Sequence, residues 1–213
     1  MSSQPTLLFD LDGTLIDSVA DLTTALNCLR GEFDLPPLSV VEVTGMVGDG
    51  ARKLVQRAMP ADCQPVDSVS RFLAHYHQHL CDQTTPYPGI SELLHEFADH
   101  PMAVVTNKPI TLTREVLDRL GLTPAFRCII GGDSYAEKKP HPLPVLKALE
   151  LLNETAAQAI MIGDHHTDLH AGRGAGCRTC FCRWGFGHTD GTLPDWEVAS
   201  TGQLAALLRG LKS

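Results

Sequence analysis

The sequence predicts an α/β fold in which a parallel sheet is covered by helices on both faces and a small helical cap is inserted after the first strand. Short β-prone apolar runs alternate with segments of helical periodicity, which is typical of βα units. The apolar runs are continuous, as expected for strands that are covered on both faces. One early stretch interrupts this alternation, because it contains helix-like patterns and no convincing strand.

Four apolar runs have the length and composition of buried strands: residues 6–9, 102–105, 128–130 and 159–162. Residues 178–182 form a weaker fifth run. Helical patterns that would cover the sheet follow these runs, at 91–97, 111–120, 143–152, 168–175 and 201–211. Gly121 and Gly176 stand where a glycine is expected after the end of a helix, which supports the order of strand and helix.

The interruption extends over residues 17–83, and we expect it to form a helical cap on a core made of residues 1–16 and 84–213. Prolines punctuate the segment, and helix-like stretches occur at 19–29, 51–59 and 69–79. Ligands of open parallel sheets bind beyond the carboxyl ends of the strands. An insert after the first strand would therefore lie over the expected ligand site.

The composition excludes several classes of function. The chain has 213 residues, 17 Lys and Arg against 25 Asp and Glu, and a formal charge of −8. This acidic balance argues against nucleic acid or an anionic membrane as the main partner, because both favour basic proteins. We expect no signal peptide and no membrane-spanning helix. We therefore expect a cytoplasmic protein whose seven cysteines are reduced thiols.

Polar side chains follow each of the four clear strands in the sequence. They are Asp10 and Asp12, then Thr106, Asn107 and Lys108, then Lys138 and Lys139, and finally Asp164 and Asp168. The carboxyl ends of parallel strands share one edge of the sheet, so these side chains would lie within reach of one another. Two carboxylates as close as Asp10 and Asp12 repel unless a cation lies between them or one holds a proton. Such an Asp-x-Asp alone is also typical of a solvated turn, but polar groups at four equivalent places favour a site.

At these residues the sequence resembles the haloacid dehalogenase superfamily of phosphohydrolases. The run from Asp10 to Leu15 is similar to the first motif of that family, Thr106 to the second, Lys139 to the third, and Asp164 with Asp168 to the fourth. The resemblance covers essentially the whole chain and implies a Rossmann-like core. Finer matches resemble the phosphoglycolate phosphatase branch, at residues 17–18, 47–51, 106–108 and 139–142.

The resemblance implies a phosphomonoester hydrolase that forms a phosphoaspartyl intermediate. Asp10 would attack the phosphorus, and Asp12 would protonate the leaving group and then activate water. Lys139 would balance the charge of the nucleophile and the phosphoryl oxygens. Thr106 and the backbone N–H of Asn107 would hydrogen-bond the phosphoryl group.

The resemblance also implies a magnesium ion, and Mn²⁺ is the alternative that His165, next to Asp164, leaves open. It assigns the ligands to the side chains of Asp10 and Asp164 and to the backbone carbonyl of Asp12, with Asp168 orienting the groups around them. His165 departs from the branch, in which serine is expected, and His166 follows it. A histidine there would either accept a softer divalent ion or point outward, and we favour the outward orientation.

The implied substrate is a small phosphorylated metabolite, and 2-phosphoglycolate is the first expectation. The alternative is another phosphomonoester, such as a sugar phosphate or N-acetylmuramic acid 6-phosphate, and cap residues would decide between them. Arg52 is a candidate for a substrate contact from the cap, although a solvent-facing turn fits its surroundings equally well. We expect a monomer or a homodimer.

A phosphorelay receiver domain is a remote alternative, because it also combines an acidic metal site with a phosphorylated Asp, a Thr or Ser and a Lys on a parallel sheet. Receivers, however, have no acid two residues after the phosphorylated Asp, no inserted cap and a much shorter chain. The presence of Asp12 and of the insert therefore favours the hydrolase.

Overall fold

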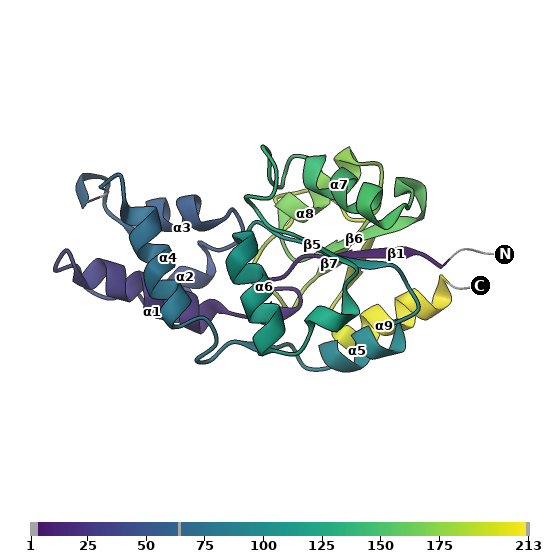
Figure 1. Cartoon of the computed structure of the whole chain (residues 1–213), viewed down its shortest axis with the longest axis horizontal. Coiled ribbons are helices and arrows are strands. Elements are labelled where there is room, and N and C mark those ends of the chain that lie inside the picture. Colours follow the sequence, from purple (N-terminus) through teal and green to yellow (C-terminus); the bar gives the residue numbers. More distant parts are fainter. Residues whose placement is uncertain (1–3, 64, 212–213) are drawn as a thin grey trace.

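The computed structural model describes residues 4–63 and 65–211, which form a six-stranded parallel sheet with helices around it (Figure 1). The order is β5-β4-β1-β6-β7-β8, and neighbouring strands are parallel throughout. The strands are β1 (Thr6–Phe9), β4 (Met102–Val105), β5 (Cys128–Ile130), β6 (Ala159–Gly163), β7 (Arg178–Cys182) and β8 (Trp196–Val198). This architecture confirms the predicted α/β fold class.

Alternate residues of the central strand β1 point into two separate hydrophobic cores. Leu7 and Phe9 belong to one core and Leu8 to the other, and all three side chains are fully buried. The first core lies under α5 (Ile90–Glu96), α6 (Ile110–Arg119) and α9 (Thr201–Gly210), and the second under α7 (Leu143–Leu152) and α8 (His166–Gly174). A strand buried on both faces requires apolar residues at every position, which explains the continuous apolar run.

The helical insert leaves the sheet and returns to it at a short antiparallel pair, β2 (Ile16–Asp17) with β3 (Thr85–Pro86). Between these strands the chain forms α1 (Val19–Gly31), α2 (Val40–Thr44), α3 (Ala51–Ala58) and α4 (Ser68–Gln78). We call these four the cap helices. They lie together at one end of the molecule, beyond the carboxyl end of β1 (Figure 1). The exact division at residues 16/17 and 83/84 stays a proposal.

One buried carboxylate joins the two ends of the insert. Asp21 in α1 is fully buried and accepts hydrogen bonds from the backbone N–H of Gln83 and of Thr84, at 3.0 and 2.8 Å. The hydroxyl of Thr84 donates to the same carboxylate at 2.6 Å. Asp21 therefore fixes the start of the cap helices against the segment that returns to the sheet.

The elements that the sequence did not indicate are short. Strand β8 has three residues and pairs with β7 only, so it carries little of the apolar signal of a central strand. Helix α2 has five residues, but its start does carry a sequence signal. Ser39 and Glu42 form a capping box, in which each side chain bonds the backbone N–H of the other residue.

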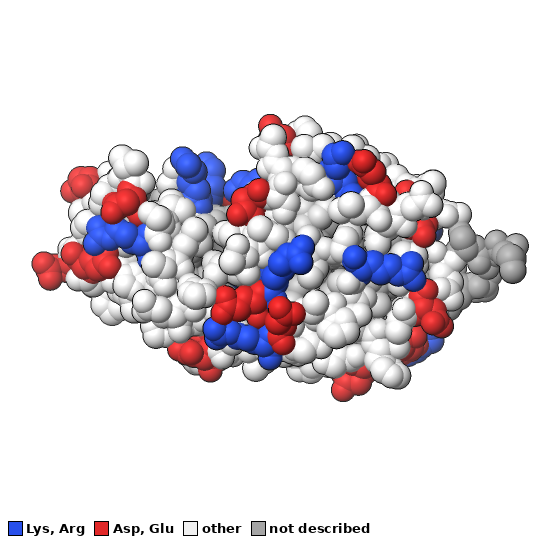
Figure 2. Space-filling view, in the orientation of Figure 1, with Lys and Arg blue, Asp and Glu red and all other residues white. Residues whose placement is uncertain are grey.

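On the face shown in Figure 2, acidic and basic side chains are interspersed and separated by uncharged surface. The described residues of this face therefore present no broad basic surface of the kind that nucleic acids bind. Among the helices of residues 4–63 and 65–211, none is both long and apolar enough to cross a membrane.

Candidate active site

The ends of β1 and β6 and the segment after β5 bring a lysine between two buried carboxylates. Lys139 Nζ lies 2.8 Å from Asp10 Oδ1 and donates a hydrogen bond to Asp168 Oδ1 at 2.5 Å. The Lys139 side chain is only 1% exposed. A lysine so far from solvent keeps its charge only beside an opposite charge. The two carboxylates raise the pKa of Lys139 above its ordinary value although burial alone would lower it, so the lysine is a cation here.

A third carboxylate lies beside the two that contact Lys139, so the cluster contains more acidic than basic side chains. Asp10, Asp164 and Asp168 are all buried, and one oxygen of each lies within 4.8 Å of the others. Burial and the neighbouring carboxylates raise the pKa of Asp10 to about 6 and that of Asp164 to about 8. If all three carboxyls were ionised, the one lysine would offset only one of their three negative charges. The group therefore fits a hard divalent cation, which prefers carboxylate oxygens.

Two loops hold the Asp164 carboxylate in place. The hydroxyl of Thr14 donates to Oδ1 at 3.0 Å, and the backbone N–H groups of Phe186 and Gly187 donate to Oδ2 at 2.8 and 3.0 Å. Gly13 has a φ of +89°, and a Cβ there would lie 2.2 Å from Asp164 Oδ2. Glycine is therefore required at position 13 both for its backbone conformation and for the space above the carboxylate.

Asp12 points into a different environment from that of Asp10. Its Oδ1 accepts hydrogen bonds from Ser18 Oγ at 2.6 Å and from Lys108 Nζ at 2.9 Å. Lys108 also donates to the hydroxyl of Tyr76 in α4, at 2.6 Å. Burial alone would lower the pKa of Lys108, but Asp12 and Tyr76 raise it above its ordinary value. Two carboxylates two residues apart are thus held by two different lysines.

Asn107 joins the end of β4 to two other segments. Its Nδ2 donates to the backbone carbonyl of Lys139 at 2.9 Å and to that of Gly48, before α3, at 3.1 Å. Thr106 is buried, and its Oγ1 accepts a hydrogen bond from the backbone N–H of Lys108 at 3.2 Å. These bonds fix both residues at the mouth of the site.

A cleft lies between the cap helices and the strand ends. Its core side consists of Asp10, Asp12, Thr106, Asn107 and Lys108, whereas its cap side is formed mainly by Leu22, Val47, Ala51, Leu54, Phe72, Leu73 and Tyr76. The expected residues Lys139, Asp164 and Asp168 are not among the described residues that line this cleft, but they cluster with Asp10, which does. Arg52 is exposed and is not among the described residues that line the cleft. Its contribution to substrate binding stays a prediction.

The comparisons with known proteins agree with this geometry. The family model described as haloacid dehalogenase-like hydrolase matches residues 7–182. The chain belongs to the haloacid dehalogenase-like hydrolases.

Among the relatives that match this chain are phosphoglycolate phosphatases. The phosphoglycolate phosphatase of Aquifex aeolicus is 37% identical over 204 residues, covering 95% of each chain. That of Neisseria meningitidis is 37% identical over 222 residues, covering 96% of this chain and 94% of its own. The crystal structure of a predicted phosphoglycolate phosphatase from Haemophilus somnus superposes with a TM-score of 0.88 at 28% identity, covering 97% of this chain and 99% of that one. The chain is therefore a phosphatase, and this family membership argues against the receiver-domain alternative.

The preferred expectation that His165 points outward is wrong. The side chain is buried, and its Nδ1 accepts a hydrogen bond from the backbone N–H of Thr167 at 3.4 Å and lies 3.0 Å from the hydroxyl of the same residue. The ring thus caps the start of α8. Burial lowers the pKa of His165 to about 4, so the ring is neutral at neutral pH. A Cβ on Gly48 would lie 2.6 Å from this ring, which places the loop before α3 directly over it.

Proposed function

We propose that this phosphatase hydrolyses 2-phosphoglycolate to glycolate and phosphate through a phosphoaspartyl intermediate. The observation that supports this most is the separation of two carboxylates at one cleft, Asp10 beside Lys139 and Asp12 beside Lys108 and Ser18. Double displacement at phosphorus needs a nucleophile and a separate acid/base. These two neighbouring carboxylates differ in the partners that surround them, as those two roles require.

In the first proposed step a carboxylate oxygen of Asp10 attacks the phosphorus, and the bond to the leaving alkoxide breaks. Protonated Asp12 gives its proton to the alkoxide and becomes a carboxylate. In the second step Asp12 takes a proton from water, whose oxygen attacks the phosphorus and releases Asp10 and inorganic phosphate. Thr106 and the backbone N–H of Asn107 are the proposed donors to the phosphoryl oxygens. Lys139 limits the negative charge that builds up beside Asp10.

The buried carboxylates of this structure fit a magnesium ion. Asp10 and Asp164, together with the backbone carbonyl of Asp12, are the proposed ligands, and Mn²⁺ is the alternative ion. Asp168 would position Lys139, to which it is bonded, and its Oδ2 accepts from the backbone N–H of His165 at 3.0 Å. When bound, a divalent cation offsets the repulsion between the Asp10 carboxylate and a phosphate dianion.

The cleft favours a small substrate over a sugar phosphate. Its cap side is apolar apart from Tyr76, whose hydroxyl is already bonded to Lys108. The hydroxyl groups of a sugar would lose water there without finding partners, which is unfavourable. Glycolate carries one carboxylate, and among the described residues that line the cleft Lys108 supplies the one cationic side chain. These features support 2-phosphoglycolate over N-acetylmuramic acid 6-phosphate.

Phosphate release from a panel of esters, measured with Mg²⁺ and with Asp10→Asn as the blank, tests this proposal. The panel holds 2-phosphoglycolate, N-acetylmuramic acid 6-phosphate, common sugar phosphates and nucleotides. We expect 2-phosphoglycolate to lead kcat/KM by tenfold or more, which is about 1.4 kcal/mol in transition-state binding. Equal rates across the panel, or a lead by another ester, would leave the phosphatase chemistry and overturn the substrate.

The same assay tests the metal. EDTA should stop phosphate release and added Mg²⁺ should restore it, whereas activity that persists after thorough chelation would contradict the proposed ion. A cytoplasmic location and a monomeric or homodimeric state stay predictions.

A further inference from the structure

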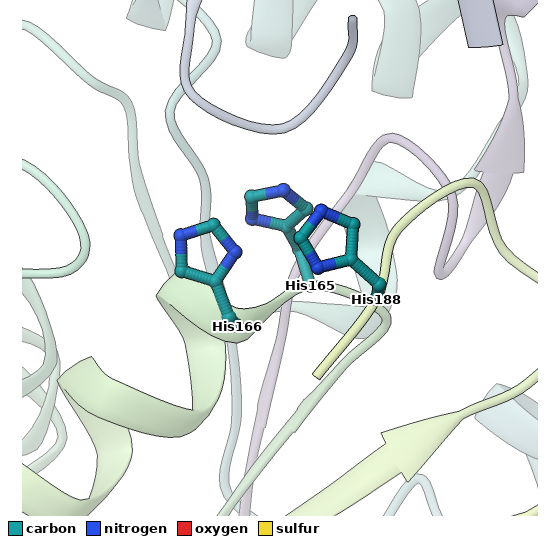
Figure 3. Close-up of side chains that lie close together, drawn as sticks. All are labelled: His165, His166 and His188. Carbon is teal, nitrogen blue, oxygen red and sulfur yellow. The ribbon is translucent and has the colours of Figure 1, made fainter. Parts of the chain in front are cut away.

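Three histidines that take no part in the proposed chemistry lie together beside the candidate active site. His165 and His166 stand at the start of α8, and His188 comes from the loop between β7 and β8 (Figure 3). The ring centres of His165 and His166 are 4.1 Å apart, and those of His166 and His188 are 5.4 Å apart. One ring nitrogen of each residue lies within 4.8 Å of the other two.

The backbone, and not only side-chain packing, brings these rings together. The N–H of His166 donates to the backbone carbonyl of His188 at 2.8 Å, which fixes the distant loop against α8. His165 and His166 are adjacent in the chain, and the bond from Thr167 to His165 Nδ1 fixes the orientation of the first ring. The cluster is therefore built before any ligand binds.

The cluster also contains a buried polar atom that lacks a hydrogen-bond partner among the described residues. Within the described residues, Nδ1 of His166 is buried and has no hydrogen-bond partner. The Asp49 carboxylate, in the loop before α3, interacts electrostatically with both His165 and His166. Asp49 also forms an ion pair with Arg57, so it supplies only part of its charge to the histidines. An unpartnered imidazole nitrogen within a cluster of three rings is an environment that favours a bound cation.

We propose that His165, His166 and His188 bind a divalent transition-metal ion such as Zn²⁺, Ni²⁺ or Co²⁺, at a site separate from the carboxylates of Asp10 and Asp164. Imidazole suits these ions, whereas carboxylate oxygens suit magnesium. Zinc–nitrogen bonds of about 2.1 Å place two tetrahedral ligands roughly 3.4 Å apart. The nitrogens, which lie within 4.8 Å of one another, would have to approach by at most about 1.4 Å to close around an ion.

Binding there would stiffen the candidate active site without touching the substrate. The loop that carries His188 also carries Phe186 and Gly187, whose N–H groups hold Asp164. Trp184 in the same loop donates to the backbone carbonyl of Thr14 at 3.1 Å. An ion on His188 would fasten this loop to α8 and so hold Asp164 more firmly.

The test measures transition metal bound to the full chain in the presence of excess Mg²⁺, which is added to occupy the carboxylates of Asp10 and Asp164. Metal-free protein is dialysed against Zn²⁺ or Co²⁺, and bound metal is counted by mass spectrometry. We expect one tightly bound ion per chain for the wild type and at least tenfold weaker binding for His188→Ala and for His166→Ala. His188 is exposed, so its truncation should leave the fold intact, and circular dichroism checks this. His95→Ala, an exposed histidine on α5, is the matched control and should bind as the wild type does.

Equal binding by the wild type and His188→Ala would overturn the proposal. A sulfur-to-cobalt charge-transfer band would also overturn it, because the ion would then sit on cysteine thiolates and not on imidazoles. A third readout is thermal unfolding, in which Zn²⁺ should raise the Tm of the wild type and of His95→Ala but not of His188→Ala. None of these measurements depends on phosphatase activity, so they can fail or succeed independently of the proposed substrate.

Discussion

The ammonium group of Lys108 donates a hydrogen bond at 2.6 Å to the hydroxyl of Tyr76, across the boundary between the sheet and the cap helices. The same ammonium group lies 2.9 Å from Asp12 Oδ1. Tyr76 is buried, and its ring stacks on Phe72 with the ring centres 5.9 Å apart. The position of α4 is therefore linked through one lysine to the carboxylate that we propose as the acid/base.

Replacing Tyr76 by phenylalanine tests this link. Tyr76→Phe keeps the stack on Phe72 but removes one of the two side-chain acceptors of Lys108. We expect kcat to fall about tenfold or more, since a hydrogen bond to a charged group contributes about 1.5 kcal/mol or more. Burial raises the pKa of Tyr76 to about 12, so the hydroxyl stays protonated in the assay.

Tyr135→Phe is the matched control, because Tyr135 is partly exposed beside the second hydrophobic core and outside the residues that line the cleft. Its kcat should equal that of the wild type. If Tyr76→Phe also keeps the wild-type kcat and pH profile, the hydroxyl has no part in positioning Lys108 for the reaction.

Substitutions at Asp10 and Asp12 should separate the two proposed steps. Asp10→Asn should reduce phosphate release to the background, because an amide is a poor nucleophile. Asp12→Asn should lower kcat by about 10²–10⁴-fold, the usual contribution of a general acid/base. When the reaction is quenched with acid during turnover, the wild type should carry a covalently bound phosphoryl group. The Asp10→Asn variant should carry none. Wild-type rates in either variant would remove that residue from the mechanism.

The carboxylates that the sequence indicated, Asp10 and Asp164, share one property: each directly follows or closely follows an apolar run. Asp10 and Asp164 could be placed because the edge of a parallel sheet brings strand ends together, whatever the details of packing. Tyr76 and His188 could not. Tyr76 is one aromatic residue in an amphipathic helix, and its contact with Lys108 depends on how α4 is placed over the sheet. His188 lies in a loop whose path no periodic pattern describes, and only tertiary structure brings it to His166.

The stabilising role of Asp21 could not be predicted from the sequence either. In the sequence it is an acidic residue near the start of a helix, where acids are common. Its bonds to Gln83 and Thr84 join segments that are far apart in the chain, so no local pattern reveals them.

The pH dependence of stability should reveal the crowded carboxylates when divalent ions are removed. Burial, with repulsion from Asp10 and Asp168, raises the pKa of Asp164 from 3.8 to about 8. Between these values the folded chain holds a proton that the unfolded chain has released, so the stability from Asp164 falls as the pH rises from about 4 to about 8. Removing the carboxylate should remove this loss.

We therefore expect the Tm of the wild type in EDTA, relative to that of Asp164→Asn, to fall steadily over this pH range. His165, whose pKa burial lowers from 6.5 to about 4, acts in the opposite sense below pH 6.5 in both proteins. Asp10, whose pKa is raised to about 6, acts in the same sense as Asp164, so the difference between the two proteins reports Asp164 together with its repulsion from Asp10. Mg²⁺ should reverse the decline in the wild type only. Parallel Tm profiles in EDTA would show that Asp164 titrates as an ordinary carboxyl.

The attachment of the cap helices should depend on Asp21. Asp21→Ala leaves the N–H groups of Gln83 and Thr84 and the hydroxyl of Thr84 without their buried acceptor. We expect the free energy of unfolding to fall by about 3 kcal/mol, the range for losing hydrogen bonds to a buried charged group. Urea titration followed by circular dichroism measures this loss.

Asp67→Ala is the control, because Asp67 is exposed and its side chain makes no capping bond to α4. Its effect should therefore stay within about 0.5 kcal/mol. An equally small effect for Asp21→Ala would mean that water replaces the carboxylate and that packing alone holds the cap helices at the return of the chain.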